Sequence, residues 1–280
     1  MTRKKTQTAG TVVLKCDETL HLSQTLFCGQ CFRWQKESEQ QFTGIAMGRR
    51  LTLTQTEDTI LFHDCTEKEV ETVWMPYFDL GTDYRKVQAD LKENDPVMEQ
   101  AVQYGSGIHI LRQDPWETLC SFIISQNNNI PRIQGIIDRL CSTFGEPIAG
   151  GYDFPSPERM AKLTVEDLAP LRSGFRAKYL VSASQMVASG EIDLSSLYTM
   201  DLGEARRILQ KIHGVGPKVA ECVLLYGFHR MECFPMDVWM KRAMALLYPG
   251  ETGERFGKLA GIAQQYLFHY SREHPELWEE

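Results

Sequence analysis

Apolar and polar residues alternate along several short segments in the first hundred residues of the chain. Such alternation, together with many β-branched residues, is the pattern of strands that bury one face. We therefore expect an antiparallel sheet in this part, with helices near residues 66–79 and 83–102. The expected strands cover residues 11–16, 41–46, 50–54 and 59–63.

From about residue 105 the apolar positions change to a helical spacing, and Gly, Pro and Asp separate the helical segments. A clear helix start is Asp114, which is followed by Pro115 in the first turn and by Glu117 three residues after the cap. These patterns predict an α+β protein, with an N-terminal antiparallel sheet domain at residues 1–105 and a mainly helical domain at 106–280.

Two helical segments near the C-terminal end are joined by a very short turn. Apolar residues between 202 and 212 form one helical face, and a second face covers 219–226. The turn contains Gly214 and Gly216, which permit positive φ and a close approach of the backbone to a large ligand. The unpaired N–H groups at the start of the second helix suit a DNA phosphate. From the turn alone, a phosphate site and a simple helix cap are equally well supported.

The net charge of the chain is acidic, at -7, although a nucleic-acid-binding protein is expected to present a basic face. Residues 171–245, however, hold ten Lys or Arg against seven Asp or Glu, a local surplus of three. This surplus fits an anionic partner and an ordinary mixed surface about equally. No segment has the apolar length of a membrane span and no secretory signal is visible, so we expect an intracellular protein whose eight cysteines are thiols.

Two ionisable residues after the turn are suited to catalysis. Lys218 begins the second helix beside an apolar face, and these surroundings disfavour the ammonium form and make the amine available as a nucleophile. Asp237 precedes a helical segment at 238–244, so we expect its carboxylate to cap that helix. A charged carboxylate there is also able to stabilise positive charge in a transition state. A lysine that only contacts phosphate and an aspartate that only caps a helix are the structural alternatives.

The hairpin at residues 212–218 is followed by a Gly/Pro-rich loop and an aspartate at 233–237. This arrangement resembles the helix-hairpin-helix superfamily of DNA glycosylases, and within it the chain resembles the 8-oxoguanine DNA glycosylases. The family resemblance extends over segments 29–34, 52–57, 112–115, 121–145, 174–179 and 263–268.

The resemblance implies a base-excision repair enzyme that needs no cofactor. Such an enzyme extrudes 8-oxoguanine from double-stranded DNA opposite cytosine, cleaves the N-glycosidic bond and nicks the strand. It implies that Lys218 attacks the sugar C1′ and forms a Schiff base that permits β-elimination. It also implies that Asp237 stabilises the positive charge on the sugar and assists proton transfer.

A glycosylase of this kind must take its target base out of the stack. The resemblance implies that Phe175 is the aromatic wedge, and that Arg176, Asn127 and Arg132 contact the cytosine left behind. Arg and Asn suit hydrogen bonds to base edges. Without the resemblance, Asn127 and its neighbours are more typical of a helix end or a loop.

Helical spacing places Lys218 and Cys222 on one face, and Gln264 beside Phe268 on the last long helix. Gln pairs with the Watson–Crick edge of a purine, while Phe and Cys can enclose its ring. As unaided sequence features, Cys222 and Phe268 are more typical of core residues. The resemblance adds Gly29, whose carbonyl accepts a hydrogen bond from the N7–H that 8-oxoguanine has and guanine lacks.

Two positions depart from the family pattern. Trp239 stands where animal members carry His, and Tyr226 stands where a smaller or more flexible side chain is expected. With the compact loops, these departures favour a bacterial member, which we expect to be a cytoplasmic, nucleoid-associated monomer.

The cysteines bear on two kinds of metal site. Related glycosylases hold an iron–sulfur cluster on four thiolates after this region, and the absence of cysteine after Cys233 excludes a cluster of that type. A zinc set of Cys28, Cys31, His63 and Cys65 has only weak support from spacing.

Two other functional classes remain open from the residues alone. A non-catalytic helix-hairpin-helix DNA-binding module would not need Lys218 and Asp237 together. A monofunctional alkylbase glycosylase would lack the lysine nucleophile. The preference for the base opposite the lesion is not determined by the sequence.

Overall fold

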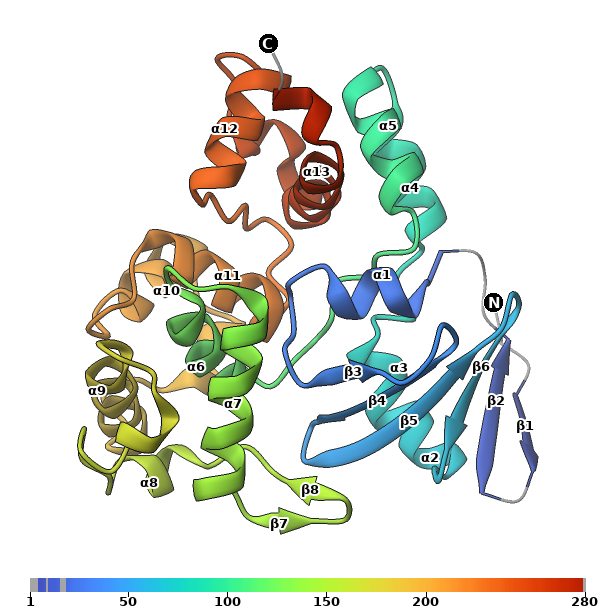
Figure 1. Ribbon diagram of the computed structural model, residues 1–280. Helices are drawn as coiled ribbons and strands as arrows, with labels where there is room; N and C mark the ends of the chain where they lie inside the picture. Colours follow the sequence, from blue (N-terminus) through green and yellow to red (C-terminus); the bar gives the residue numbers. More distant parts are fainter. Residues whose placement is uncertain (1–4, 9, 16–18, 279–280) are drawn as a thin grey trace.

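The N-terminal part of the chain folds into a sheet. The computed structural model describes residues 5–8, 10–15 and 19–278, so residue 16 of the first expected strand lies outside the described residues. Six strands in this part form one antiparallel sheet in the order β1-β2-β6-β5-β4-β3 (Figure 1), which confirms the predicted sheet. Its strands are β1 (Lys5–Thr8), β2 (Thr11–Lys15), β3 (Trp34–Lys36), β4 (Gln41–Ala46), β5 (Arg49–Gln55) and β6 (Thr59–His63).

The alternation of the strands explains which face of the sheet is buried. Leu53 of β5 pairs in register with Phe62 of β6, and both side chains are fully buried. Phe62 packs edge-on against Phe78, which follows the helical segment at 67–77. That segment consists of α2 (Glu67–Glu69), a π-helical turn (Val70–Trp74) and α3 (Met75–Tyr77), while α1 (Leu22–Phe27) connects β2 to β3.

The region predicted to be helical at 83–102 contains two helices, α4 (Tyr84–Lys92) and α5 (Pro96–Gly105). The break comes at Asn94, whose φ is 58°, and at Asp95, which caps α5 by accepting a hydrogen bond from the Met98 N–H. Pro96 cannot donate within a continuing helix, so a new helix begins there.

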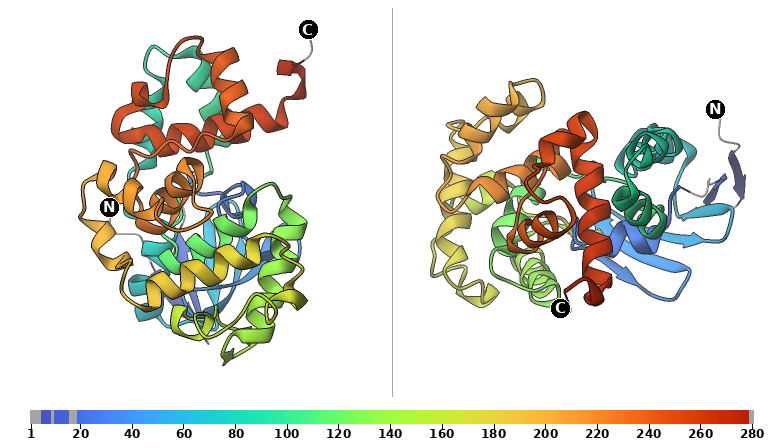
Figure 2. Two further views of the ribbon diagram at one scale, coloured as in Figure 1. Left: turned by 90° about the vertical axis from the view of Figure 1, so that its left-hand side faces the viewer. Right: turned by 90° about the horizontal axis from the view of Figure 1, so that it is seen from above.

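Helices α4 and α5 lie beside the C-terminal helix α13 (Ala260–Glu273), as all three views show (Figures 1 and 2). Tyr248 and Arg255 both donate hydrogen bonds to the Asp95 carboxylate, at 2.9 Å. In space, α4 and α5 therefore belong with the C-terminal helices, although they precede the domain boundary expected at residue 105.

The remaining helices include the hairpin and share one hydrophobic core with α4, α5 and α13. The chain passes through a two-stranded ribbon of β7 (Pro147–Ile148) and β8 (Gly151–Tyr152) between α7 and α8. The helices of this part are α6 (Pro115–Ser125), α7 (Ile130–Phe144), α8 (Pro157–Met160), α9 (Arg176–Ala188), α10 (Leu202–Leu209) and α11 (Pro217–Phe228), and α12 (Val238–Leu247) follows toward the C-terminal end. The predicted α+β class, a sheet followed by a mainly helical part, is confirmed. Among the described helices, none has both the length and the apolar character needed to cross a membrane.

Candidate active site

The predicted hairpin joins α10 to α11. Gly214 has a φ of 88°, and a Cβ added there would lie 2.4 Å from the Tyr179 ring, so only glycine fits this position without strain. Gly216 is the N-cap of α11, with φ -90° and ψ 179°, and its extended backbone is open to any residue. No side chain caps this helix end, and its first N–H groups are therefore available to an anion.

A cavity lies between the start of α11, helix α13 and the loop that follows α1. Lys218 and Cys222 reach it from α11, Gln264 and Phe268 from α13, and Asp237 from the N-cap of α12. Gly29 completes the cavity from the loop between α1 and β3. The structure thus brings together all six residues predicted for catalysis and base recognition. The complete lining is Cys28, Gly29, Phe122, Lys218, Cys222, Tyr226, Pro235, Asp237, Gln264, Gln265 and Phe268.

Lys218 lies against an aromatic ring that the sequence did not point to. Its Nζ is 5.3 Å from the centre of the Phe122 ring, within the range of a cation–π contact. Cys222 lies one helical turn further along. Burial raises the pKa of its thiol to about 11, an effect that the nearby Lys218 partly offsets. Cys222 is therefore a neutral thiol that contributes shape to the cavity.

Asp237 has the predicted capping geometry. Its Oδ1 accepts a hydrogen bond of 2.7 Å from the Met240 N–H at the start of α12. The cap fixes the carboxylate at the cavity, in the same lining as Lys218. The carboxylate is therefore placed to act on charge that develops beside the lysine.

Gln264 carries a buried atom that has no partner. Its Nε2 donates to the Pro235 carbonyl at 3.2 Å, while its Oε1 is one of three buried side-chain polar atoms in the described part of the chain without a hydrogen bond. Such an atom is costly to leave unpaired unless a ligand supplies the donor. An amide oxygen in this position accepts from the N–H groups of a purine edge.

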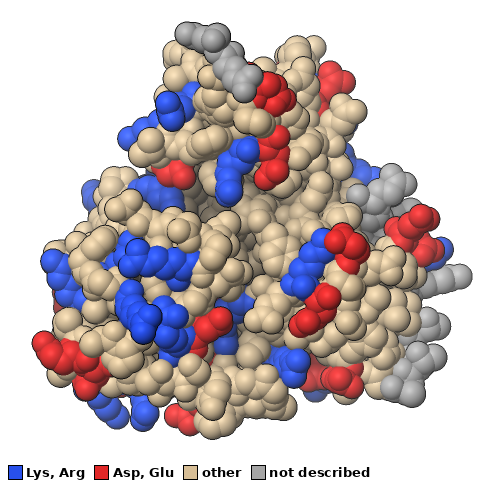
Figure 3. Space-filling model, viewed as in Figure 1, with Lys and Arg blue, Asp and Glu red and all other residues tan. Residues whose placement is uncertain are grey.

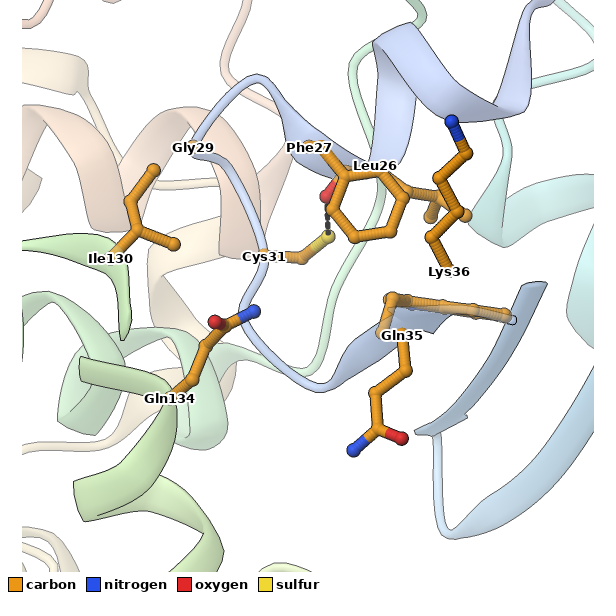
Figure 4. A pocket seen from close by; sticks show the side chains of 9 residues that line it. Leu26, Phe27, Gly29, Cys31, Gln35, Lys36, Ile130 and Gln134 are labelled. Carbon is orange, nitrogen blue, oxygen red and sulfur yellow. Dashed lines mark hydrogen bonds between the residues drawn. The ribbon is translucent and has the colours of Figure 1, made fainter. Parts of the chain in front are cut away.

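Gly29 forms a turn between α1 and β3. Its φ is 92°, and a Cβ added there would be 3.8 Å from the Phe268 ring. Gly29 also lines a second hollow on the other side of the loop, between α1, β3 and the start of α7 (Figure 4). The residues around that hollow are Leu26, Phe27, Gly29, Cys31, Trp34, Gln35, Lys36, Ile130 and Gln134.

The residues predicted to contact DNA around the extruded base lie outside the cavity, near α7 and α9. Phe175 precedes α9 and is 49% exposed, so its ring is available to a base stack. Asn127 occupies the turn before α7 with a φ of 47°, and Arg132 is exposed in the first turn of α7. On this face, Lys and Arg side chains gather over α7 and α10, and the middle of the face is hollowed (Figure 3).

Arg176 is engaged within the protein. Its guanidinium donates to the Gln126 and Asn127 carbonyls, with Nε 2.9 Å from the former and Nη2 2.9 Å from the latter, and only 2% of the residue is exposed. In this arrangement Arg176 supports the turn that presents Asn127. Its direct contact with the cytosine remains a prediction.

Five residues of the cavity wall were not predicted as site residues, namely Cys28, Phe122, Tyr226, Pro235 and Gln265. Phe122 gave no signal, because an aromatic residue in an apolar helix is ordinary core. Tyr226 was recognised only as a departure from the family, and its ring stacks on Phe122. Gln265 had a signal, since two adjacent glutamines in an apolar helical stretch are unusual.

Trp239 is engaged with α13, and the candidate zinc residues are not grouped around a metal site. The Trp239 indole donates to the Ser271 hydroxyl at 2.9 Å. Cys28 and Cys31 donate to the Thr25 and Leu26 carbonyls, each at 3.3 Å. Within residues 5–8, 10–15 and 19–278, no group of three or more His, Cys, Asp or Glu is arranged to hold a metal ion.

Comparison with known proteins places this site in a family. Residues 12–119 match the N-terminal domain of 8-oxoguanine DNA glycosylase, and residues 120–260 match the HhH-GPD superfamily of base-excision DNA repair proteins. The N-glycosylase/DNA lyase OGG1 of Arabidopsis thaliana is 32% identical, over 89% of this chain and 76% of its own length.

Solved structures agree over the whole chain. The 8-oxoguanine glycosylase/lyase of Clostridium acetobutylicum, bound to double-stranded DNA with cytosine opposite 8-oxoguanine, superposes with a TM-score of 0.90 at 34% identity, over 98% of each chain. MBOgg1, solved with a low-affinity DNA ligand, gives a TM-score of 0.93 at 42% identity, over 98% of this chain and 99% of its own. The chain belongs to the 8-oxoguanine DNA glycosylase family of the HhH-GPD superfamily.

Proposed function

We propose that this protein is a bifunctional DNA glycosylase and abasic-site lyase that removes 8-oxoguanine from duplex DNA. The observation that carries the proposal is the single cavity that joins Lys218 and Asp237 to Gln264 and Gly29. A nucleophile and a carboxylate alone would fit many reactions. The additional unpartnered amide oxygen of Gln264 points to a ligand with N–H donors, as a purine edge provides.

In the first step the neutral amine of Lys218 attacks C1′ of the extruded nucleotide. The C1′–N9 bond breaks, the base leaves with the electron pair and takes up a proton, and the Asp237 carboxylate stabilises the positive charge on the sugar. Opening of the sugar ring then gives a protonated Schiff base between Nζ and C1′, with the ring oxygen converted to a hydroxyl.

In the second step a proton leaves C2′ and the C3′–O3′ bond breaks. The electron pair of the C2′–H bond forms the new double bond, and the 3′ phosphate leaves as the 5′-phosphate end of the downstream strand. Water then hydrolyses the Schiff base and regenerates Lys218. The enzyme thereby nicks the strand without a cofactor.

Recognition of the damaged base is assigned to the walls of the cavity. Gln264 accepts from the purine edge, Cys222 and Phe268 enclose the ring, and the Gly29 carbonyl accepts from N7–H. Guanine lacks that proton, so the Gly29 contact separates the two bases. A neutral Cys222 thiol is compatible with packing against an uncharged ring.

The DNA around the lesion is assigned to the surface beside the cavity. The α11 N-terminus with Gly214 and Gly216 binds phosphate, Phe175 fills the gap in the stack, and Asn127 and Arg132 contact the opposite base. Because the Clostridium acetobutylicum relative is bound to DNA with cytosine opposite the lesion, we propose cytosine as the preferred partner. The protein is proposed to act as a monomer in the cytoplasm, since one chain contains every residue of the mechanism.

The proposal is tested by borohydride trapping on duplexes that contain one 8-oxoguanine opposite C, A, G or T. We expect a covalent protein–DNA adduct with the wild-type protein, strongest opposite C. Lys218→Gln should abolish the adduct, and Asp237→Asn should slow its formation by at least tenfold. Arg132→Ala should reduce the preference for C while leaving the adduct detectable.

Two outcomes would overturn the proposal. One is the absence of an adduct with the wild-type protein on the 8-oxoguanine·C duplex. The other is an undiminished adduct with Lys218→Gln, which would remove the lysine from the mechanism. Base release without an adduct would instead identify a monofunctional glycosylase.

A further inference from the structure

Tyr226 lies in the wall of the cavity and packs on the aromatic ring that Lys218 contacts. Its ring stacks on Phe122 with 5.4 Å between centroids and an interplanar angle of 15°. Lys218 Nζ lies over the same Phe122 ring. Tyr226 is only 4% exposed, so its hydroxyl needs a partner inside the protein.

That partner is Gln265 on α13, and both the oxygen and the nitrogen of its side-chain amide form hydrogen bonds. The Tyr226 hydroxyl donates to Oε1 at 2.5 Å, and Nε2 donates to the Cys28 carbonyl at 3.1 Å. Gln265 is 1% exposed. If Tyr226 and Gln265 only filled space, apolar residues at these positions would stabilise the protein as well, because burying polar groups carries a desolvation cost.

The Cys28 carbonyl belongs to the loop that contains Gly29 (Figure 4). The carbonyl on the other side, that of Gln30, accepts a hydrogen bond of 2.7 Å from Gln113 Nε2. The Gln113 N–H in turn donates to the Tyr226 carbonyl at 2.9 Å. The peptide unit before Gly29 and the one after Gln30 are thus both tied to the chain around Tyr226, and the Gly29 carbonyl belongs to the unit between them.

Glycine rotates more freely than any other residue, so the direction of its carbonyl depends on how its neighbours are held. We propose that Tyr226 and Gln265 are positioning residues that aim the Gly29 carbonyl into the cavity and thereby set the discrimination between 8-oxoguanine and guanine. This inference rests on the proposed function. It gives a role to Tyr226, one of the two departures from the family pattern, and to Gln265, which sequence reasoning did not single out.

The experiment compares two activities of the full-length protein under single-turnover conditions. Excision of 8-oxoguanine opposite cytosine requires the Gly29 contact, whereas cleavage of a preformed abasic site requires Lys218 and no base. Tyr226→Phe removes the hydroxyl and keeps the stacked ring, and Gln265→Leu removes the whole amide. The matched control is Tyr270→Phe. Tyr270 lies on α13, as Gln265 does, and its hydroxyl donates to Gln100 Oε1 at 2.8 Å.

We expect Tyr226→Phe to slow 8-oxoguanine excision by roughly 3- to 10-fold, the effect of one lost hydrogen bond. Abasic-site cleavage should stay within about twofold of wild type. The double variant Tyr226→Phe with Gln265→Leu should be no slower than Gln265→Leu alone, because both residues act through the Cys28 carbonyl. The ratio of 8-oxoguanine to guanine excision should fall with the excision rate, and Tyr270→Phe should change none of these values.

Three results would overturn the inference. They are an unchanged excision rate in Tyr226→Phe, an equal loss of excision and abasic-site cleavage, or the same loss in Tyr270→Phe. Should Gln265→Leu fail to fold, Tyr226→Phe alone decides between these outcomes. Failure of the proposed function is recognised separately, because the wild-type protein would then not excise 8-oxoguanine at all.

Discussion

Gly214→Ala is expected to destabilise the protein by an amount that can be worked out from the hairpin. With φ at 88°, an alanine is held in a conformation that L residues disfavour by about 1–2 kcal/mol. The added Cβ would also lie 2.4–2.7 Å from atoms of the Tyr179 ring. That ring packs edge-on against Phe175 and His213, so it has little room to move. Overpacking of this kind costs about 1–3 kcal/mol.

The sum is a loss of about 2–5 kcal/mol in the free energy of unfolding. At about 2–4 °C per kcal/mol, a loss near the middle of this range lowers Tm by about 7–14 °C. Urea titration and thermal unfolding monitored by circular dichroism both measure it. The control is Gly216→Ala in the same turn, where no atom lies within 4 Å of the added Cβ and φ is -90°.

The cost of the positive φ and the cost of the overlap with the Tyr179 ring can be measured separately. Tyr179→Ala removes the overlapping ring, so in its background Gly214→Ala should cost only the conformational part. A double-mutant cycle should therefore give a coupling energy of about 1–3 kcal/mol. A loss of less than about 1 kcal/mol in Gly214→Ala, or an equal loss in Gly216→Ala, would refute this prediction.

The remaining predictions concern two buried polar groups. Burial raises the pKa of Glu117 to about 7 from its ordinary 4.5, so the folded protein binds this proton more tightly than the unfolded chain, and the stabilisation is lost as pH rises through 7. Urea titrations should show the stability of Glu117→Gln falling less than that of wild type between pH 5 and pH 8, by on the order of 2–3 kcal/mol, and equal pH dependence would contradict this assignment. Gln264→Leu removes an oxygen that has no partner and one hydrogen bond, from Nε2 to the Pro235 carbonyl. Thermal unfolding should therefore show a loss of at most about 1–2 kcal/mol, while single-turnover excision of 8-oxoguanine should fall at least tenfold. A large loss of stability with normal excision would assign Gln264 to the core instead.

The sequence predicted those features that depend on neighbouring residues. The cap by Asp114, the cap by Asp237 and the hairpin turn are each determined within four or five positions, and all are present as expected. The break before α5 is also local, at Asn94 to Pro96, and it was missed because the apolar spacing continues across it. Packing over long distances had no such signal. Nothing near Asp95 in the sequence indicates that Tyr248 and Arg255 bind it.

The cavity shows the same division between local and distant determinants. The residues proposed for catalysis follow from the hairpin and the next helix cap, so Lys218 and Asp237 could be placed from the sequence. Its proposed specificity depends on Gly29, in the loop between α1 and β3. Hydrogen bonds from Gln265 to Cys28, 237 positions apart, and from Gln113 to Gln30 hold this loop against the helices. A small shift between the two parts of the chain would leave the lysine and the carboxylate together and move the Gly29 carbonyl. Base discrimination should therefore be more sensitive than strand cleavage to substitutions where the loop between α1 and β3 contacts α13.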